Sequence, residues 1–199
     1  MKKLAALIVL SLSVLFSASP TFAKTSFNQL KAITTVSGNL QGSFTQDKYL
    51  NALDATLTST GKFSYLRKVS VRWETLEPIQ SEFLMTPNEV ISRQGEQELF
   101  RMNTRDNPVI STLNKIFFSV LTAEWENLAQ YFQISDATIE KESWQVELLP
   151  LDSSIQQVVQ RVELKGDVFL REIILHEKDG NRTTIRFSDL TASSNDSRL

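Results

Sequence analysis

The stretch from Phe44 to Pro78 most constrains the fold, because it holds two long runs of alternating character that meet at a basic pair, Arg67 and Lys68. Successive side chains of a strand point to opposite faces, so residues two apart share a face. The residues that share the apolar face are Leu57, Ser59, Gly61, Phe63 and Tyr65 before the pair, and Val69, Val71 and Trp73 after it. The pattern predicts two antiparallel strands that pack on an apolar interior.

Arg67 has the parity of Phe63 and Tyr65, which places its guanidinium at the inward edge of this face. A permanent charge there must find hydrogen-bond acceptors or stay unpaired at considerable cost. The ordinary surface preference of arginine favours a simpler interpretation, a strand-end charge beside a turn. Residue spacing alone leaves both interpretations open.

The rest of the chain reads as two further groups of strands around a helical insert. Ser26 is a suitable cap for a short N-terminal helix, and Asn107-Pro108 is a suitable start for a long apolar one. Further strands are expected at 40–44, 80–85, 90–93, 98–102, 134–139, 144–148, 159–164, 169–175 and 183–187. With the two long runs these make about eleven strands, and Asp179-Gly180 is the clearest hairpin turn.

A sheet of this size curls, and its concave face is then either filled by its own side chains or left as a cavity that the helices cover. Composition and spacing do not separate a filled core from a lined cavity. Aromatic and aliphatic residues serve both purposes, because a cavity wall binds methylene groups at about 0.8 kcal/mol each without directional demand.

Residues 1–23 have the form of a secretory signal, with a basic start, an apolar stretch from Leu4 to Phe16 and a small-residue cleavage site after Ala23. We therefore expect export to the periplasm and a single domain over residues 24–199. The chain has no cysteine, which excludes a lipid-attachment cysteine, disulfides and thiol catalysis. Without Lys2 and Lys3, 19 basic residues face 23 acidic ones, so nucleic acid is not an expected partner.

Signals for an enzyme are scarce. The sequence has a single histidine, His176, and lacks the Gly-x-Ser-x-Gly, Gly-x-Gly-x-x-Gly and phosphate-loop patterns. With no cysteine and one histidine, the usual zinc ligand sets are missing. We expect no enzyme, no metal and no cofactor; a lipid-acting enzyme is an alternative without a catalytic constellation behind it.

The region from Phe44 to Pro78 resembles the LolA family, the periplasmic carriers of outer-membrane lipoproteins. The residues that carry the resemblance are Phe44-Thr45-Gln46, Gly61, Phe63, Arg67, Trp73 and Pro78, in step and without gaps. The resemblance implies a mainly β (α+β) fold: an incomplete, strongly curved antiparallel β-barrel with an N-terminal helix and an inserted helical lid over an apolar cavity. It also implies that Arg67 latches the lid by hydrogen bonds to lid carbonyls, which cargo breaks.

The residues that the strand and helix patterns offer for the cavity wall are Phe63, Tyr65, Val71, Trp73, Phe83, Met85, Leu113, Ile116, Phe117 and Val120. Two features depart from the family pattern. Lys68 follows the latch arginine where the family often has proline, and only about a dozen polar residues follow the strand near Phe187. These departures leave the cargo open.

The first functional hypothesis is a monomeric periplasmic carrier that binds the acyl chains of a lipidated cargo and takes it from the inner to the outer membrane. The resemblance implies a lipoprotein cargo, an inner-membrane release complex and an outer-membrane acceptor. A glycolipid or another acylated small molecule is the alternative cargo. The second hypothesis is a non-catalytic periplasmic scaffold protein, which predicts a solid core.

Overall fold

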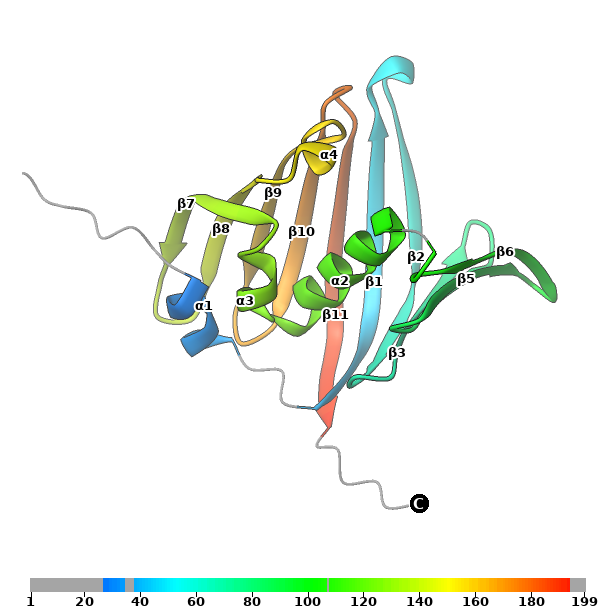
Figure 1. Ribbon diagram of the computed structural model, residues 1–199, viewed down its shortest axis with the longest axis horizontal. Helices are drawn as coiled ribbons and strands as arrows, with labels where there is room; N and C mark the ends of the chain where they lie inside the picture. The colour runs from blue at the N-terminus through cyan, green and yellow to red at the C-terminus, as the bar shows by residue number, and fades with distance from the viewer. Residues whose placement is uncertain (1–26, 35–37, 107, 194–199) are drawn as a thin grey trace, which may run out of the picture.

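The computed structural model describes residues 27–34, 38–106 and 108–193. The predicted signal segment, Ser26 and Asn107 lie outside the described residues. Eleven strands form one antiparallel sheet in the order β6-β5-β4-β3-β2-β1-β11-β10-β9-β8-β7, which curls around a concave face without closing (Figure 1). The predicted fold class, an incomplete antiparallel barrel that is mainly β, is confirmed.

The first meander runs from the middle of the sheet to one edge. Its strands are β1 (Asn39–Leu50), β2 (Ala55–Leu66), β3 (Ser70–Glu77), β4 (Ser81–Met85), β5 (Glu89–Gln94) and β6 (Gln97–Asn103). A short 3-10 turn, η1 (Asn51–Leu53), joins β1 to β2, and each strand pairs with the next along the chain. The two long runs of the sequence are therefore neighbouring strands, as their alternation predicts.

The second meander runs from the other edge back to the middle. Its strands are β7 (Phe132–Ile139), β8 (Trp144–Pro150), β9 (Val159–Gly166), β10 (Leu170–Glu177) and β11 (Arg182–Ser193). β11 pairs with β1 and joins the two meanders into one sheet. This pairing brings together residues that are far apart in the chain, such as Phe44 and Phe187.

Four helices accompany the sheet: α1 (Phe27–Ile33), α2 (Pro108–Thr122), α3 (Trp125–Leu128) and α4 (Ser153–Gln156). The apolar insert starts at Pro108, as predicted, and α2 lies across the concave face with α3 beside it (Figure 1). The helical insert ends before Phe132. Ala123 has a left-handed φ of 54°, which ends α2, and Phe132 begins β7.

A cluster of aromatic side chains fills the concave face over β1 to β3. The ring of Trp73 stacks on Phe44 at a centroid distance of 3.9 Å and meets Phe187 edge-on at 6.1 Å, and Phe63 packs beside it. A Cβ on Gly61 would lie 2.0 Å from the carbonyl oxygen of Glu74 and 2.6 Å from the Phe44 ring, so only glycine lets these groups approach so closely. We call Phe44, Phe63, Trp73 and Phe187 the aromatic cluster.

Candidate functional site

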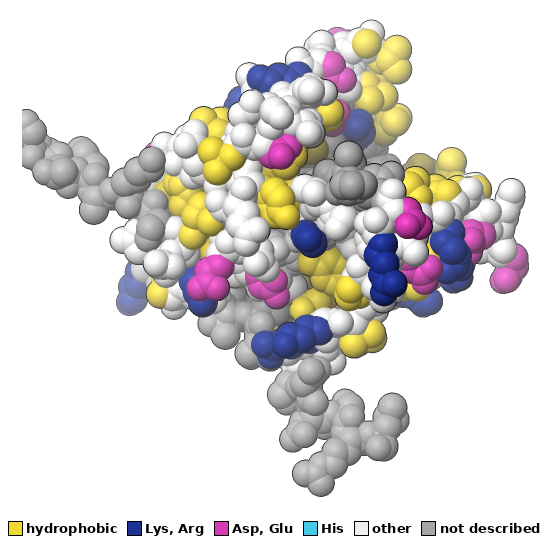
Figure 2. Space-filling view, viewed as in Figure 1, with side chains coloured by type: hydrophobic (Ala, Val, Ile, Leu, Met, Phe, Trp, Pro, Cys, Tyr) yellow, Lys and Arg dark blue, Asp and Glu magenta, His cyan; other side chains and the backbone are white. Residues whose placement is uncertain are grey.

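An apolar cavity of about 470 Å³ lies between α2 and the concave face, beside the aromatic cluster. The cavity lies within the size range of roughly 300–1,000 Å³ that is usual for small-molecule sites. Its wall is aliphatic and aromatic apart from two polar residues, Asn114 and Thr183. Hydrophobic side chains are visible on either side of the helical cover in the space-filling view (Figure 2).

Both meanders contribute to the wall. The first contributes Phe83, Met85, Val90, Phe100 and Met102 from β4 to β6. The second contributes, among others, Leu148, Val162, Ile173, Leu175 and Ile185 from β8 to β11. The helices α2, α3 and α4 close the remaining sides with Ile116, Phe117, Val120, Leu128 and Ile155. Side chains from the two meanders thus face a common space that they do not fill.

The strand register explains why one face of the second meander is cavity wall. Ile173 is opposite Ile185, and Leu175 is opposite Thr183, so these four residues share the concave face. A β-bulge between His176 and Glu177 then pairs Glu177 with Val159, which also lines the cavity. The wall therefore ends beside a carboxylate.

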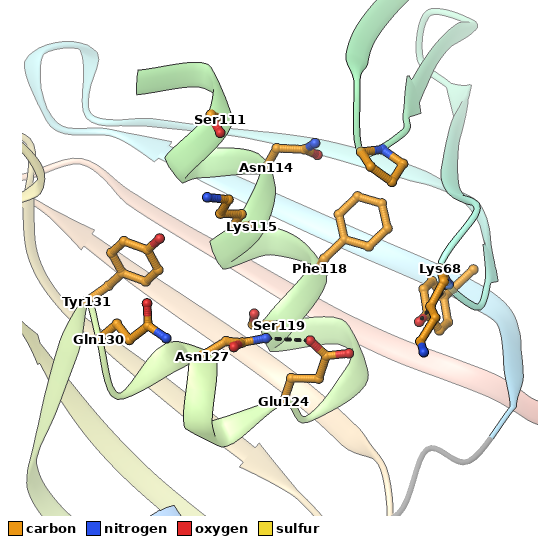
Figure 3. Close-up of a pocket in the computed structure, with 12 residues that line it drawn as sticks. Lys68, Ser111, Asn114, Lys115, Phe118, Ser119, Glu124, Asn127, Gln130 and Tyr131 are labelled. Atoms are coloured by element: carbon orange, nitrogen blue, oxygen red, sulfur yellow. Dashed lines mark hydrogen bonds between the residues drawn. The ribbon is translucent and has the colours of Figure 1, made fainter. Parts of the chain in front are cut away.

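A second, polar pocket of about 460 Å³ lies on the other side of α2, between α2, α3 and the turns after β2 and β4 (Figure 3). Its wall includes Lys68, Lys115, Glu124, Asn127 and Tyr131. Glu124 accepts a hydrogen bond of 2.7 Å from the Asn127 amide, so the carboxylate is held by its neighbour. No histidine or acid pair among these side chains marks the pocket for acid–base catalysis.

Asn114 lies between the two spaces, since it lines both. Its side-chain nitrogen donates a hydrogen bond of 2.8 Å to the backbone carbonyl of Thr86, which ties α2 to the turn between β4 and β5. Its side-chain oxygen is buried without a hydrogen-bond partner in the described part of the chain. Such an unpaired buried oxygen costs about 1–3 kcal/mol, which lowers the stability of this packing of α2 on the sheet.

Comparison with known families decides what kind of fold surrounds the cavity. Residues 35–198 match the family described as "Outer membrane lipoprotein carrier protein LolA". The chain belongs to the LolA family. No curated protein sequence matches the chain.

Solved structures with a similar course of the chain include a LolA superfamily protein from Nitrosomonas europaea, with 12% identity, a TM-score of 0.46, and coverage of 84% of this chain and 92% of that one. The MucA/MucB complex from Pseudomonas aeruginosa has 15% identity and a TM-score of 0.47, over 85% of this chain and 58% of that one. A putative outer membrane lipoprotein-sorting protein domain from Vibrio parahaemolyticus has 12% identity and a TM-score of 0.42, over 84% and 91%.

The ten residues that we expected along the LolA-type cavity fall into three groups. Phe83, Met85, Ile116, Phe117 and Val120 lie on the cavity wall. Phe63, Tyr65, Val71 and Trp73 are buried instead within the core, and Tyr65 also borders the polar pocket. Leu113 falls within α2, but its side chain lies outside the described residues.

Tyr65 sits where the core meets the polar pocket. Its ring packs edge-on against Phe118 of α2 at a centroid distance of 6.1 Å. Burial, the largest cause, raises the pKa of the Tyr65 hydroxyl, so the side chain stays neutral and serves packing.

Arg67 lies in the turn between β2 and β3 and is exposed. Its backbone N–H donates a hydrogen bond of 2.9 Å to the side-chain oxygen of Asn39. The next residue, Lys68, has a left-handed φ of 61°, a conformation closed to proline. The lysine therefore fits the turn that is present here.

Sequence reasoning missed the wall residues of β8 to β11, and also Val90, Phe100, Met102, Leu128, Phe132 and Ile155. β10 carries apolar residues on both faces, with Ile173, Ile174 and Leu175 in succession, so its period does not reveal the inward face. The pairing of β11 with β1 settles it, because Phe187 faces Phe44 in the core and Ile185 is two residues away on the same face. Once the pairing of β11 with β1 is known, counting every second residue from Phe187 identifies the residues of β11 that line the cavity.

Three further observations concern metal binding, the single histidine and the helices. Among the described residues, no group of three or more histidine, aspartate or glutamate side chains could hold a metal ion. His176 Nε2 lies 2.8 Å from Glu163 Oε1, on the opposite face from the cavity. In the described residues, no helix is long and apolar enough to cross a membrane.

Proposed function

We propose that this LolA-family chain binds the acyl chains of a lipidated cargo in its apolar cavity and carries the cargo across the periplasm from the inner to the outer membrane. The observation that carries the proposal is the apolar space between α2 and the concave face. A lipoprotein is the expected cargo, and a glycolipid or another acylated small molecule is the alternative.

The chemistry of the wall suits hydrocarbon. Each methylene moved from water into such a space contributes about 0.8 kcal/mol, whatever its orientation. Met85 and Met102 add flexible side chains that adapt to chains of different shape. A wall of this kind binds alkyl chains by area and leaves the identity of the cargo to groups outside it.

The cover can move without loss of the sheet. α2 rests on the sheet through ring contacts, such as Phe117 on Trp73 at 5.8 Å, and through the hydrogen bond from Asn114 to Thr86. Breaking these contacts leaves every strand pair intact. A hydrocarbon chain that replaces the Phe117 contact compensates for its loss, which makes the helix a reversible lid.

Arg67 is proposed as the latch of this lid. A hydrogen bond from a guanidinium to a carbonyl contributes about 1.5–3 kcal/mol, enough to bias the lid and little enough for a buried acyl chain to overcome. Arg67→Leu should change the release rate of bound lipid and leave the melting temperature nearly unchanged. Arg105→Leu, at another exposed arginine, is the matched control. Equal release rates in Arg67→Leu and wild type would refute the latch.

Lipid binding is the decisive test of the proposed function. The protein should copurify with lipid that mass spectrometry identifies after gentle extraction, and the delipidated protein should bind the neutral dye Nile red at a saturable site. Phe117→Asp places a carboxylate at the wall and should abolish binding. Val168→Asp, at an exposed position, should bind as wild type does.

A second variant distinguishes loss of lipid binding from loss of the fold. Ile185→Phe adds volume to the cavity wall and removes no packing, so it should lower lipid capacity at an unchanged circular dichroism spectrum. A scaffold protein requires a solid core, and the cavity counts against it. A wild-type protein that is lipid-free and binds no dye would overturn the carrier.

Export is tested separately. If residues 1–23 are a signal peptide, the protein recovered from the periplasmic fraction should begin at Lys24, as read by N-terminal sequencing. Crosslinking of cargo-loaded protein in cells should capture an inner-membrane release complex and an outer-membrane acceptor. Retention of the protein in the cytoplasm would contradict the proposed route.

A further inference from the structure

The cavity wall ends at a pair of opposite charges. Lys48 of β1 is opposite Thr183 of β11, and Glu177 of β10 is opposite Val159 of β9. Thr183 and Val159 line the cavity. Cross-strand partners share a face of the sheet, so Lys48 and Glu177 both belong to the concave face. They lie at the end of that face where a turn joins β10 to β11.

The two side chains meet across β11. Lys48 Nζ lies 3.2 Å from Glu177 Oε1, and the side chains keep 38% and 13% of their exposure. The carboxylate is thus the more buried partner, with apolar wall on one side and the lysine on the other. Removing its counter-charge would leave a largely desolvated anion.

The ion pairs of Arg186 in β11 lie on the opposite face. Arg186 contacts Asp47 at 2.9 Å and Glu172 at 3.0 Å, and all three residues have the parity that points away from the cavity. Exposed pairs of this kind are common on sheets and contribute little. A charge pair at the rim of an apolar cavity needs a different explanation.

We propose that the Lys48–Glu177 ion pair selects the head group of the cargo, admitting zwitterionic or neutral amphiphiles and rejecting those with a single net charge. The inference rests on the proposed function, because it needs acyl chains in the cavity. A zwitterion can exchange partners with both members of the pair, and a neutral head group leaves the pair intact. An amphiphile with a single charge binds one residue of the ion pair and leaves the other without a counter-charge.

The test uses four amphiphiles with the same sixteen-carbon chain. They are palmitoyl lysophosphatidylethanolamine (zwitterionic), monopalmitoylglycerol (neutral), palmitate (anionic) and hexadecyltrimethylammonium (cationic), each titrated below its micelle concentration as a competitor of Nile red. Wild-type protein should bind the first two about tenfold more tightly than the last two, the factor that corresponds to 1.4 kcal/mol.

The variants should shift this order in opposite directions. Lys48→Met leaves the carboxylate, so hexadecyltrimethylammonium should gain about tenfold relative to monopalmitoylglycerol. Glu177→Gln leaves the lysine, so palmitate should gain by a similar factor. The double variant should show no preference by charge. Glu172→Gln, on the opposite face, is the matched control and should keep the wild-type order.

The outcomes separate this inference from the proposed function. If the four amphiphiles bind wild type and all variants in the same order, the head-group filter is overturned and the carrier stands. If no amphiphile displaces Nile red from wild-type protein, both fail. Melting temperatures of the single and double variants show whether a lost preference reflects a lost fold.

Discussion

Strand β11 passes from a filled region of the molecule to a hollow one within four residues. Phe187 is packed against Phe63 at 5.2 Å and belongs to the aromatic cluster. Ile185, the next residue on the same face, lines the cavity, and Thr183 follows it. β1 runs alongside with Phe44, Gln46 and Lys48 on that face.

The two regions differ in what lies across from the strand. Over the aromatic cluster, Phe117 of α2 reaches the Trp73 ring, and large flat side chains fill the space between helix and sheet. Across from Ile185 and Leu175 lies the cavity, an open space that the surrounding side chains do not fill. The concave face of β11 therefore packs as core at one end and borders open space at the other.

The largest effect should come from the filled region. Trp73→Ala removes a ring that is 8% exposed and contacts four other rings, so we expect a loss of about 3–5 kcal/mol in the free energy of unfolding. Urea denaturation measures it. Phe83→Ala, at a cavity-wall ring that is 38% exposed, is the comparison and should lose much less. Equal losses would erase the distinction between the regions.

A smaller loss is expected at Gly61. Gly61→Ala forces a methyl group against the Glu74 carbonyl oxygen and the Phe44 ring, and overpacking of this kind costs about 1–3 kcal/mol. The measurement is again urea denaturation. Gly95 has a left-handed φ of 57° and nothing within reach of a Cβ, so Gly95→Asn should be close to neutral. A neutral Gly61→Ala would show that the aromatic cluster is less tightly packed than described.

At the cavity wall, binding should suffer more than stability. Leu175→Ala removes a half-buried side chain that already faces open space, so the unfolding free energy should fall by less than about 2 kcal/mol, the lower end for a buried leucine. The affinity for a palmitoyl probe should fall several-fold through lost contact area. Calorimetry and Nile red displacement measure the two quantities. Unchanged affinity would place the ligand elsewhere.

The smallest effect concerns pH on the outer face. Hydrogen bonds from Thr58 and then Arg186 lower the pKa of Asp47 from its ordinary value of 3.8. A lowered folded-state pKa stabilises the protein above that ordinary value, and the contribution is lost as the pH falls through the folded-state pKa. For this exposed pair we expect less than about 1 kcal/mol. Asp47→Asn should flatten the stability profile below about pH 4 in acid titrations followed by circular dichroism, and lipid binding at neutral pH should not change.

Much of the sheet could be predicted from the sequence, because alternation fixes which residues share a face. Phe63, Tyr65, Val71 and Trp73 were expected to point inward, and all four are buried. The helix after Asn107 was expected from proline and apolar spacing, and α2 begins at Pro108. Val69 shows the limit of the method, since its parity is inward but it lies exposed in the turn before β3.

Alternation thus determined the strands and their inward faces, and proline with apolar spacing determined the covering helix, because these depend on neighbours a few residues away. Tertiary structure alone decided which inward residues fill the core and which line the cavity, because that depends on their distance to the other meander and to α2. It also decided that Lys48 and Glu177 meet, since only the order β1-β11-β10 brings together two charges that lie 129 residues apart.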